Sequence, residues 1–251
     1  MTTGAIVAGG RSTRFGDADK SVAELAGVPL IRRVADRLAG ADDPIPPGAS
    51  RAASGDPAVD DLVINCRPDQ RDAIADALDG HPLPVRWALD DELDLGPVAG
   101  ILNACQAAPG EYVALVACDM PFVDPAFVAS LVSDAAGHRV GDRVSADNET
   151  GGHDAADNEA AGHDAAVPRL DDRWFQTTQA VYRAAPMAAA CDRALSRGER
   201  KILSPLDELD YVVVDDETIR SRTTERTFTN VNTRAELAEA NSAVTDALGD
   251  R

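Results

Sequence analysis

Short apolar runs alternate with helically spaced apolar segments over the first half of the chain. The runs have the length of buried strands and are bounded by turn residues, as at Gly4 to Ala8, Leu62 to Cys66, Val85 to Leu89 and Tyr112 to Cys118. Helical spacing follows the first three, at 29–38, 69–78 and 97–108. This βαβαβα order predicts an α/β fold with a doubly wound, mostly parallel sheet and helices on both faces.

The run Tyr112 to Cys118 (YVALVAC) is the most continuous apolar stretch, which indicates a central strand buried on both faces. Ordered structure is expected again from Trp174 to Arg183, with a helix at 187–197, a strand from Tyr211 to Val214 and a closing helix from Thr233 to about Ala240. We therefore expect residues 1–251 to form one domain.

Two segments lack these patterns. Residues 41–60 are rich in Pro, Gly, Ser, Ala and Asp, which predicts a flexible, exposed loop without catalytic residues. Residues 147–156 (DNETGGHDAA) and 157–166 (DNEAAGHDAA) form a tandem duplication, and its composition predicts a disordered acidic insertion over 141–166. The duplicated His153 and His163 are a poor metal site, because mobile ligands rarely hold a metal.

The formal net charge is −19, from 43 acidic and 24 basic residues spread along the chain. So acidic a protein repels nucleic acid and anionic membranes, and neither is an expected partner. No run approaches the roughly 20 apolar residues that span a bilayer, and the N-terminus lacks a signal-like segment, so we expect a cytoplasmic location. The four cysteines have no zinc-site spacing and are expected to be buried free thiols.

The first strand leads into the loop Ala8 to Lys20, AGGRSTRFGDADK. Glycine residues (Gly9, Gly10 and Gly16) let backbone N–H groups approach phosphate oxygens, and Arg14 and Lys20 add positive charge. Lys20 is one of only two lysines in the chain, the other being Lys201. The loop is not a P-loop, because Gly16 and Lys20 are not adjacent, and its glycine spacing does not match the G-x-G-x-x-G dinucleotide motif. It predicts a polyphosphate site of another kind.

The central strand ends in Cys118-Asp119-Met120-Pro121, which places a carboxylate at the same crevice. Phosphoryl-type transfer uses a hard cation to bridge phosphate oxygens, and an Asp at a strand end is a usual Mg²⁺ ligand. Asp119 is therefore the predicted metal ligand.

The motifs together resemble the molybdenum cofactor guanylyltransferase family. They occur in the family's order, as A-G-G-x-S-x-R-x-G-x-x-K-S from Ala8, L-x-G-x-P-L from Leu25, G-P-x-A-G from Gly96, C-D-x-P from Cys118, G-E-R-K from Gly198 and N-V-N-T from Asn230. The resemblance implies a Rossmann-like nucleotidyltransferase that moves GMP from GTP to the phosphate of the molybdenum-molybdopterin cofactor. It also implies Mg²⁺ as cofactor and handover of the product to a molybdoenzyme or a cofactor-insertion protein.

The resemblance also implies residue roles. GTP would be held by residues of the first loop and of two later turns, namely Ala8, Gly9, Gly10, Arg14, Gly16, Lys20, Asp90, Gly96 and Pro97. Arg14, Lys20 and Asp119 would be catalytic, with Asp119 on Mg²⁺. The acceptor would meet Arg200, Lys201, Asn230 and Asn232. An acceptor phosphate is already ionised at neutral pH, so positioning and electrostatics suffice and no general base is needed.

The chain departs from the family pattern at Phe15, where methionine is usual, and at Gln176-Thr177-Thr178, where a proline normally follows the polar residue. Asp91 is an alternative to Asp90 near the nucleotide. A cobinamide-phosphate guanylyltransferase, a molybdopterin cytidylyltransferase and a non-catalytic GTP-binding partner of cofactor assembly remain alternative functions.

Overall fold

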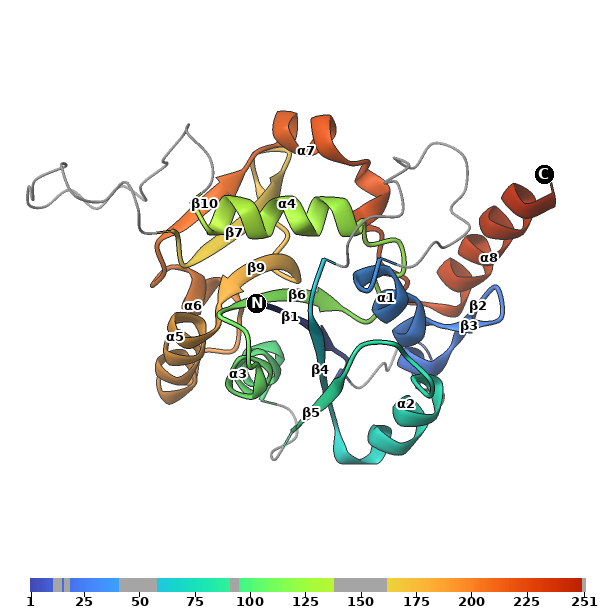
Figure 1. The fold of residues 1–251 in the computed structure, drawn as a ribbon, viewed down its shortest axis with the longest axis horizontal. Coiled ribbons are helices and arrows are strands. Elements are labelled where there is room, and N and C mark those ends of the chain that lie inside the picture. The colour runs from blue at the N-terminus through green and yellow to red at the C-terminus, as the bar shows by residue number, and fades with distance from the viewer. Residues whose placement is uncertain (11–14, 16–18, 41–57, 91–94, 138–161, 250–251) are drawn as a thin grey trace, which may run out of the picture.

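The computed structural model describes residues 1–10, 15, 19–40, 58–90, 95–137 and 162–249. In this part of the chain eight strands form one twisted sheet, and a two-stranded ribbon stands apart from it (Figure 1). Seven strands follow the order β10-β7-β9-β6-β1-β4-β5, and β8 pairs only with β7. This arrangement confirms the predicted α/β class.

The strands have these bounds: β1 Thr2–Val7, β4 Asp61–Cys66, β5 Val85–Leu89, β6 Tyr112–Ala117, β7 Ala165–Leu170, β8 Trp174–Phe175, β9 Gln179–Arg183 and β10 Tyr211–Val214 in the sheet, with β2 Glu24–Leu25 and β3 Val28–Pro29 in the ribbon. β5, β4, β1 and β6 pair in parallel, whereas β9 runs antiparallel to both β6 and β7. β6 lies in the middle of the order and its residues 113–116 are buried, as predicted for a central strand.

The helices have these bounds: α1 Leu30–Leu38, α2 Arg71–Ala77, α3 Pro97–Ala107, α4 Pro125–Ala135, α5 Ala184–Ser196, α6 Leu203–Leu206, α7 Asp216–Arg222 and α8 Arg234–Gly249, with short 3-10 helices η1 Lys20–Val22, η2 Pro68–Gln70 and η3 Glu225–Phe228. α3 and α5 cover one face of the sheet, and α1 and α4 cover the other (Figure 1). The predicted doubly wound layering is therefore present.

Strand periodicity explains the two cores. Along β1, Ala5 and Val7 join the core under α3 and α5, while Ile6 joins the core under α1 and α4. Successive strand residues point to opposite faces, so a strand covered on both faces must be apolar throughout. That requirement is why the central strands read as continuous apolar runs.

A third, smaller core fixes the C-terminal helix. Leu25 and Leu30, from the region of the β2–β3 ribbon, pack with Phe122, and α8 adds Ala240 and Val244. α8 extends to Gly249, well beyond the predicted end near Ala240. This packing keeps the segment before α8 beside the sheet.

The structure differs from the sequence expectations at both irregular segments. The sequence predicts disorder for residues 162–166, but β7 begins at Ala165, and Ala165 and Ala166 are fully buried. Residues 58–60 were assigned to a flexible loop, but Val59 is buried and Asp60 N–H donates to the carbonyl of Thr2 at 2.8 Å. Small apolar side chains suit a tightly packed strand, so Ala165 and Ala166 can be part of the hydrophobic core although the surrounding sequence is poor in large apolar residues. The rest of both predictions, 41–57 and 141–161, lies outside the described residues.

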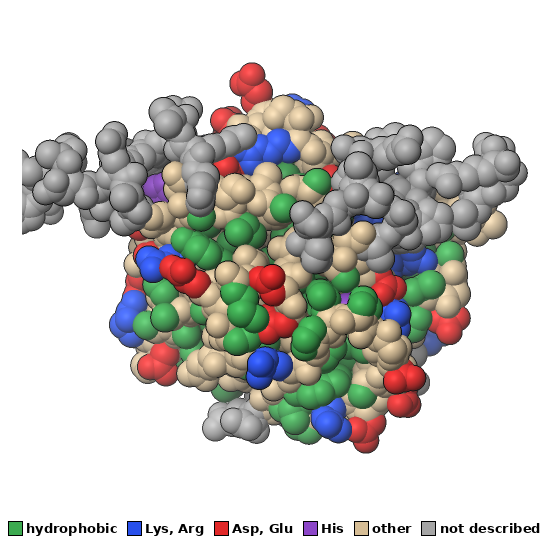
Figure 2. All heavy atoms as spheres, in the orientation of Figure 1, with side chains coloured by type: hydrophobic (Ala, Val, Ile, Leu, Met, Phe, Trp, Pro, Cys, Tyr) green, Lys and Arg blue, Asp and Glu red, His purple; other side chains and the backbone are tan. Residues whose placement is uncertain are grey.

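Acidic side chains are dispersed over the face in Figure 2 rather than gathered into one patch. Among the described helices, none is long and apolar enough to cross a membrane.

Candidate active site

The carboxyl ends of β5, β4, β1 and β6 meet at one edge of the sheet. Backbone hydrogen bonds continue just past the strand ends: Asp90 N–H donates to the carbonyl of Cys66 at 3.0 Å, and Cys118 N–H donates to that of Val7 at 3.1 Å. In open α/β sheets this edge forms the ligand crevice. The residues that follow these strands therefore share one rim.

Lys20 is buried at this rim, with its side chain 10% exposed. Its Nζ donates to Asp119 Oδ2 at 2.6 Å and to Asn232 Oδ1 at 3.0 Å. The structure thus brings together three predicted site residues that come from distant parts of the sequence. These contacts give a structural role to Lys20, one of the two lysines in a chain whose other basic residues are arginines.

The segment before α8 is fixed at both ends. Val231 N–H donates to the carbonyl of Asp119 at 2.8 Å. Thr233 and Glu236 form a reciprocal N-terminal cap: Glu236 N–H donates to Thr233 Oγ1 at 3.1 Å, and Thr233 N–H donates to Glu236 Oε2 at 2.9 Å. Asn232 N–H donates to the same carboxylate at 2.5 Å, and these N–H groups lower the pKa of Glu236. This cap orients Asn232 toward Lys20.

Gly9 lies against the carboxylate of Asp90. A Cβ added at Gly9 would stand 2.3 Å from Asp90 Oδ2, so only glycine fits without a shift. Asp90 Oδ1 accepts hydrogen bonds from Asn65 Nδ2 at 2.7 Å and Asn103 Nδ2 at 3.3 Å. Asp90 therefore lies at the rim, and the alternative, Asp91, lies outside the described residues.

The turn after β4 supports the start of the nucleotide loop. Arg67 Nη1 donates to the carbonyls of Gly9 at 3.2 Å and Gly10 at 2.8 Å, and Gln70 Nε2 donates to the carbonyl of Ala8 at 3.1 Å. Neither side chain was among the predicted site residues, and nor was Asn65. The one signal in the sequence was their place at or just after the carboxyl end of a predicted strand.

The predicted nucleotide turn and part of the predicted acceptor segment lie against each other. Gly96 has φ +82°, and Pro97 begins α3. A Cβ at Gly96 would stand 3.2 Å from Arg200 Cβ and 3.4 Å from the carbonyl of Arg200. Arg200 and Lys201 are exposed. Two segments predicted for different substrates are thus neighbours.

Three of the predicted residues receive less support. Arg14 and Gly16 lie outside the described residues, so their roles stay predictions. Asn230 is exposed, and the structure describes no contact for it with Lys20.

The segment 176–178, where the sequence departs from the family pattern, lies beside the candidate site. Ala117 N–H at the end of β6 donates to the carbonyl of Thr178 at 3.0 Å.

The titratable groups suit anion binding better than covalent catalysis. Burial raises the pKa of Cys66 and of Cys118 to about 12, with Asp90 and Asp119 respectively adding to the effect, so both thiols stay protonated at neutral pH. Within the described ranges no three His, Cys, Asp or Glu residues gather as a metal cluster. One carboxylate, one ammonium group and a glycine backbone fit a phosphate-bound cation.

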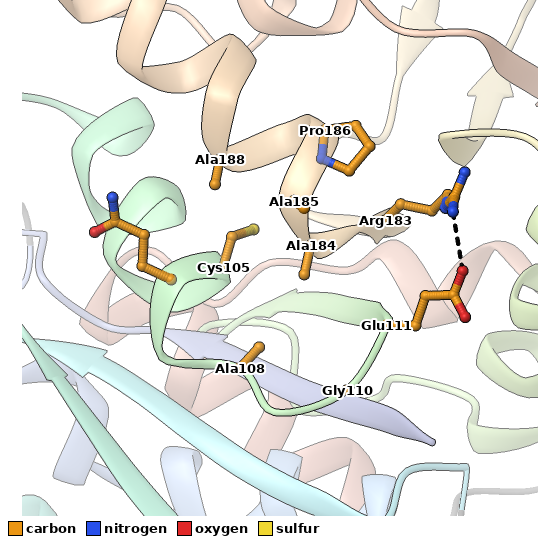
Figure 3. A pocket seen from close by; sticks show the side chains of 10 residues that line it. Cys105, Ala108, Gly110, Glu111, Arg183, Ala184, Ala185, Pro186 and Ala188 are labelled. Atoms are coloured by element: carbon orange, nitrogen blue, oxygen red, sulfur yellow. Dashed lines mark hydrogen bonds and ion pairs between the residues drawn. The ribbon is translucent and has the colours of Figure 1, made fainter.

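A pocket of about 510 Å³ lies at the opposite edge of the sheet (Figure 3). It lies between the end of α3 and the start of α5, with Cys105, Ala108 and Ala184 among its lining and the ion pair of Arg183 with Glu111 at 3.1 Å on one side. It contains none of the predicted site residues.

The sequence profile of the MobA-like NTP transferase domain matches residues 4–210. This chain belongs to that family. A probable molybdenum cofactor guanylyltransferase of Natronomonas pharaonis is 38% identical over 95% of this chain and 96% of its own length. Another of Methanosarcina mazei is 28% identical over 92% and 86%. The family resemblance inferred from the motifs is confirmed, and the protein is a nucleotidyltransferase.

A solved structure shows the same fold as this NTP transferase. The molybdopterin-guanine dinucleotide biosynthesis protein A of Archaeoglobus fulgidus superposes with a TM-score of 0.63 at 23% identity, covering 97% of this chain and 99% of that one. The matched family domain ends at residue 210, before Asn232. The C-terminal segment nevertheless contacts Lys20, so the candidate site extends beyond the matched domain.

Proposed function

We propose that this NTP transferase moves GMP from GTP to the phosphate of the molybdenum-molybdopterin cofactor, releasing pyrophosphate and forming molybdopterin guanine dinucleotide. The observation that carries the chemistry is the contact of Lys20 with Asp119 at the rim of the sheet. The names of the relatives support the choice of guanine and of the acceptor.

In this proposal Ala8, Gly9 and Gly10 begin the triphosphate cradle, and Arg14, Gly16 and Lys20 complete it. An ammonium group has three hydrogens. Lys20 gives two of them to Asp119 and Asn232, and the third can meet a phosphate oxygen. As charge moves onto the leaving pyrophosphate, Lys20 and Arg14 would offset it.

Asp119 would also hold Mg²⁺. Its Oδ1 is buried and has no hydrogen-bond partner among the described residues, while Oδ2 accepts from Lys20. Mg²⁺ sites commonly combine one or two carboxylates with substrate phosphates, so a single Asp suits this role. When bound, Mg²⁺ would supply charge neutralisation of the phosphate oxygens.

Both substrates would meet at the rim. Asp90, Gly96 and Pro97 would adjoin the guanine and ribose, and the acceptor phosphate would meet the exposed cations Arg200 and Lys201. Asn230 and Asn232 would orient it from the other side. An oxygen of the acceptor phosphate would bond to the α-phosphorus of GTP as the bond from that phosphorus to the α–β bridging oxygen breaks. The attacking oxygen loses its negative charge, and the leaving pyrophosphate takes up the bonding electron pair and that charge.

We place the enzyme in the cytoplasm and propose that it passes its product to a molybdoenzyme or a cofactor-insertion protein. All four cysteines are free and buried, which suits a reducing compartment.

The test is pyrophosphate release from each of the four NTPs, with Mg²⁺ and high salt, with and without the molybdopterin acceptor. Release that needs both GTP and acceptor is the expected result. Release with CTP would instead indicate a cytidylyltransferase, and release from GTP with cobinamide phosphate alone would indicate that acceptor. Binding of GTP without release under any condition would favour a non-catalytic partner.

A further inference from the structure

Gln70, at the end of η2, lies in the interior with 2% of its surface exposed. Its Nε2 donates to the carbonyl of Ala8 at 3.1 Å and to Asp19 Oδ2 at 2.9 Å. Its Oε1 accepts from the backbone N–H of Arg67 at 3.0 Å. Both donor hydrogens and the acceptor oxygen of this buried amide are therefore used.

The two partners of Nε2 lie at the two ends of the nucleotide loop. Ala8 directly follows β1, and Asp19 directly precedes Lys20. Asp19 caps η1 as well, because its Oδ1 accepts from Ser21 N–H at 2.9 Å and from Ser21 Oγ at 2.8 Å. A single amide group thus joins the start of the loop to the turn that carries Lys20.

We propose that Gln70 is a positioning residue for nucleotidyl transfer, which holds Lys20 in place through Asp19. This inference rests on the proposed function, since it concerns the same lysine. Gln70 lies on the turn after β4, so the support comes from a different part of the fold than the loop itself.

The partners of Gln70 require a hydrogen-bond donor at this position, which an amide provides and an ionised carboxylate does not. Nε2 is a donor facing a carboxylate and a carbonyl, and both are acceptors. A glutamate at position 70 would have the same shape but would place a second carboxylate against Asp19. Two adjacent carboxylates cannot both ionise easily, so one of them takes up a proton at higher pH than usual. Protonated, the glutamate can donate again.

The experiment measures GTP-dependent and acceptor-dependent pyrophosphate release by Gln70→Glu from about pH 8 to about pH 6. We expect kcat near pH 8 to fall about 10-fold to about 100-fold, because small misplacements of catalytic groups cost that much. We expect the ratio of variant to wild-type kcat to rise toward unity as the pH falls. A ratio that does not change with pH would overturn the inference.

Two further variants separate positioning from general damage. Gln106→Glu makes the same chemical change at an exposed position near the end of α3, and its activity should follow that of the wild type at every pH. Gln70→Met keeps the length but removes both donors, so kcat should fall without recovery in acid. Unchanged kcat in Gln70→Met with an unchanged melting temperature would also overturn the inference, even where Gln70→Glu fails to fold.

Different proteins test the proposed function and this inference: the wild type tests the first, and the Gln70 variants test the second. Absence of pyrophosphate release by the wild type contradicts the proposed function. Wild-type release with normal behaviour of the Gln70 variants contradicts only the role of Gln70.

Discussion

Lys20 is held where its charge can serve a phosphate without being exposed to solvent. We predict that Lys20→Ala lowers kcat/KM by about 100-fold or more, the scale of losing one well-placed electrostatic group in a closed site. Initial rates of pyrophosphate release over a range of GTP concentrations measure the effect, and thermal melting checks folding. An active Lys20→Ala enzyme would remove Lys20 from the mechanism.

Gly9 and Gly10 form a matched pair for a test of close packing. An added Cβ would stand 2.3 Å from Asp90 Oδ2 at Gly9, whereas no described atom lies within 4 Å of one at Gly10. We predict that Gly9→Ala destabilises the protein by about 1–3 kcal/mol, the usual cost of overpacking. Gly10→Ala should stay within about 0.5 kcal/mol of the wild type. Chemical denaturation measures both, and equal effects would contradict the described packing.

The residues that could be predicted from the sequence are those that follow a strand end or break the composition. Asp119 follows the central strand, and Lys20 is rare by type, so both were identified before the structure. Arg67 and Gln70 were not, because their contacts join the β4 turn to the loop and depend on which strands are neighbours. Asn65, within β4, was not either, because its amide contacts Asp90 after the neighbouring strand β5. Parallel pairing of β1 with β4 brings these segments together, and periodicity does not reveal it.

At the scale of elements, deletions in the duplicated segment 147–166 test whether β7 begins within its second copy. A deletion of 147–166 would remove Ala165 and Ala166, which pair with Tyr182 and Val181 in β9. Although the sequence predicts disorder over this range, the deletion should therefore not be tolerated. We predict instead that deletion of 147–156 alone leaves melting temperature and activity nearly unchanged, because the second copy still supplies the start of β7.

The deletion of 147–166 is the matched comparison. It should lower the melting temperature clearly, since it cuts into a buried strand. A shorter deletion that is as harmful as the longer one would show that the first copy has a structural role.

Elements with strong apolar patterns could be predicted, and those shaped by neighbours could not. β5 and β10 have the predicted bounds, and α1 and α3 differ from them by one residue at one end. β7 was missed because Pro168 and small residues obscure its pattern, although it packs between β10 and β9. α4 and α7 were also missed. α7 is largely polar, and it is held by a cap in which Asp215 accepts from Thr218 N–H at 2.8 Å.

At the scale of the whole molecule, the candidate active site combines residues from the first and last parts of the sequence. Asn232 is held at Lys20 by the packing of α8 on the β2–β3 ribbon through Ala240 and Val244. The hydrogen bond from Val231 N–H to the carbonyl of Asp119 fixes the same segment. The order of the motifs in the sequence indicated the family, but only the fold shows which of these motifs lie close together in space. The cap at Thr233 and Glu236 therefore serves both the helix and the site.

The net charge of −19 makes the folded state dependent on ionic strength. Compaction brings like charges together, and salt screens them, with a Debye length of about 10 Å at 0.1 M falling to about 3 Å at 1 M. We predict that melting temperature and activity rise as NaCl increases across this range.

Sucrose at matched osmolality provides the control, because it favours the compact state by exclusion without screening charge. A triple variant of exposed residues, Asp76→Asn, Asp192→Asn and Glu239→Gln, should melt higher than the wild type in low salt and respond less to NaCl. If the variant and the wild type respond equally to NaCl, or if sucrose reproduces the whole effect, self-repulsion does not limit the stability of this enzyme. A smaller salt response in the variant would show that its acidic surface sets the ionic conditions under which the Lys20 site is assembled.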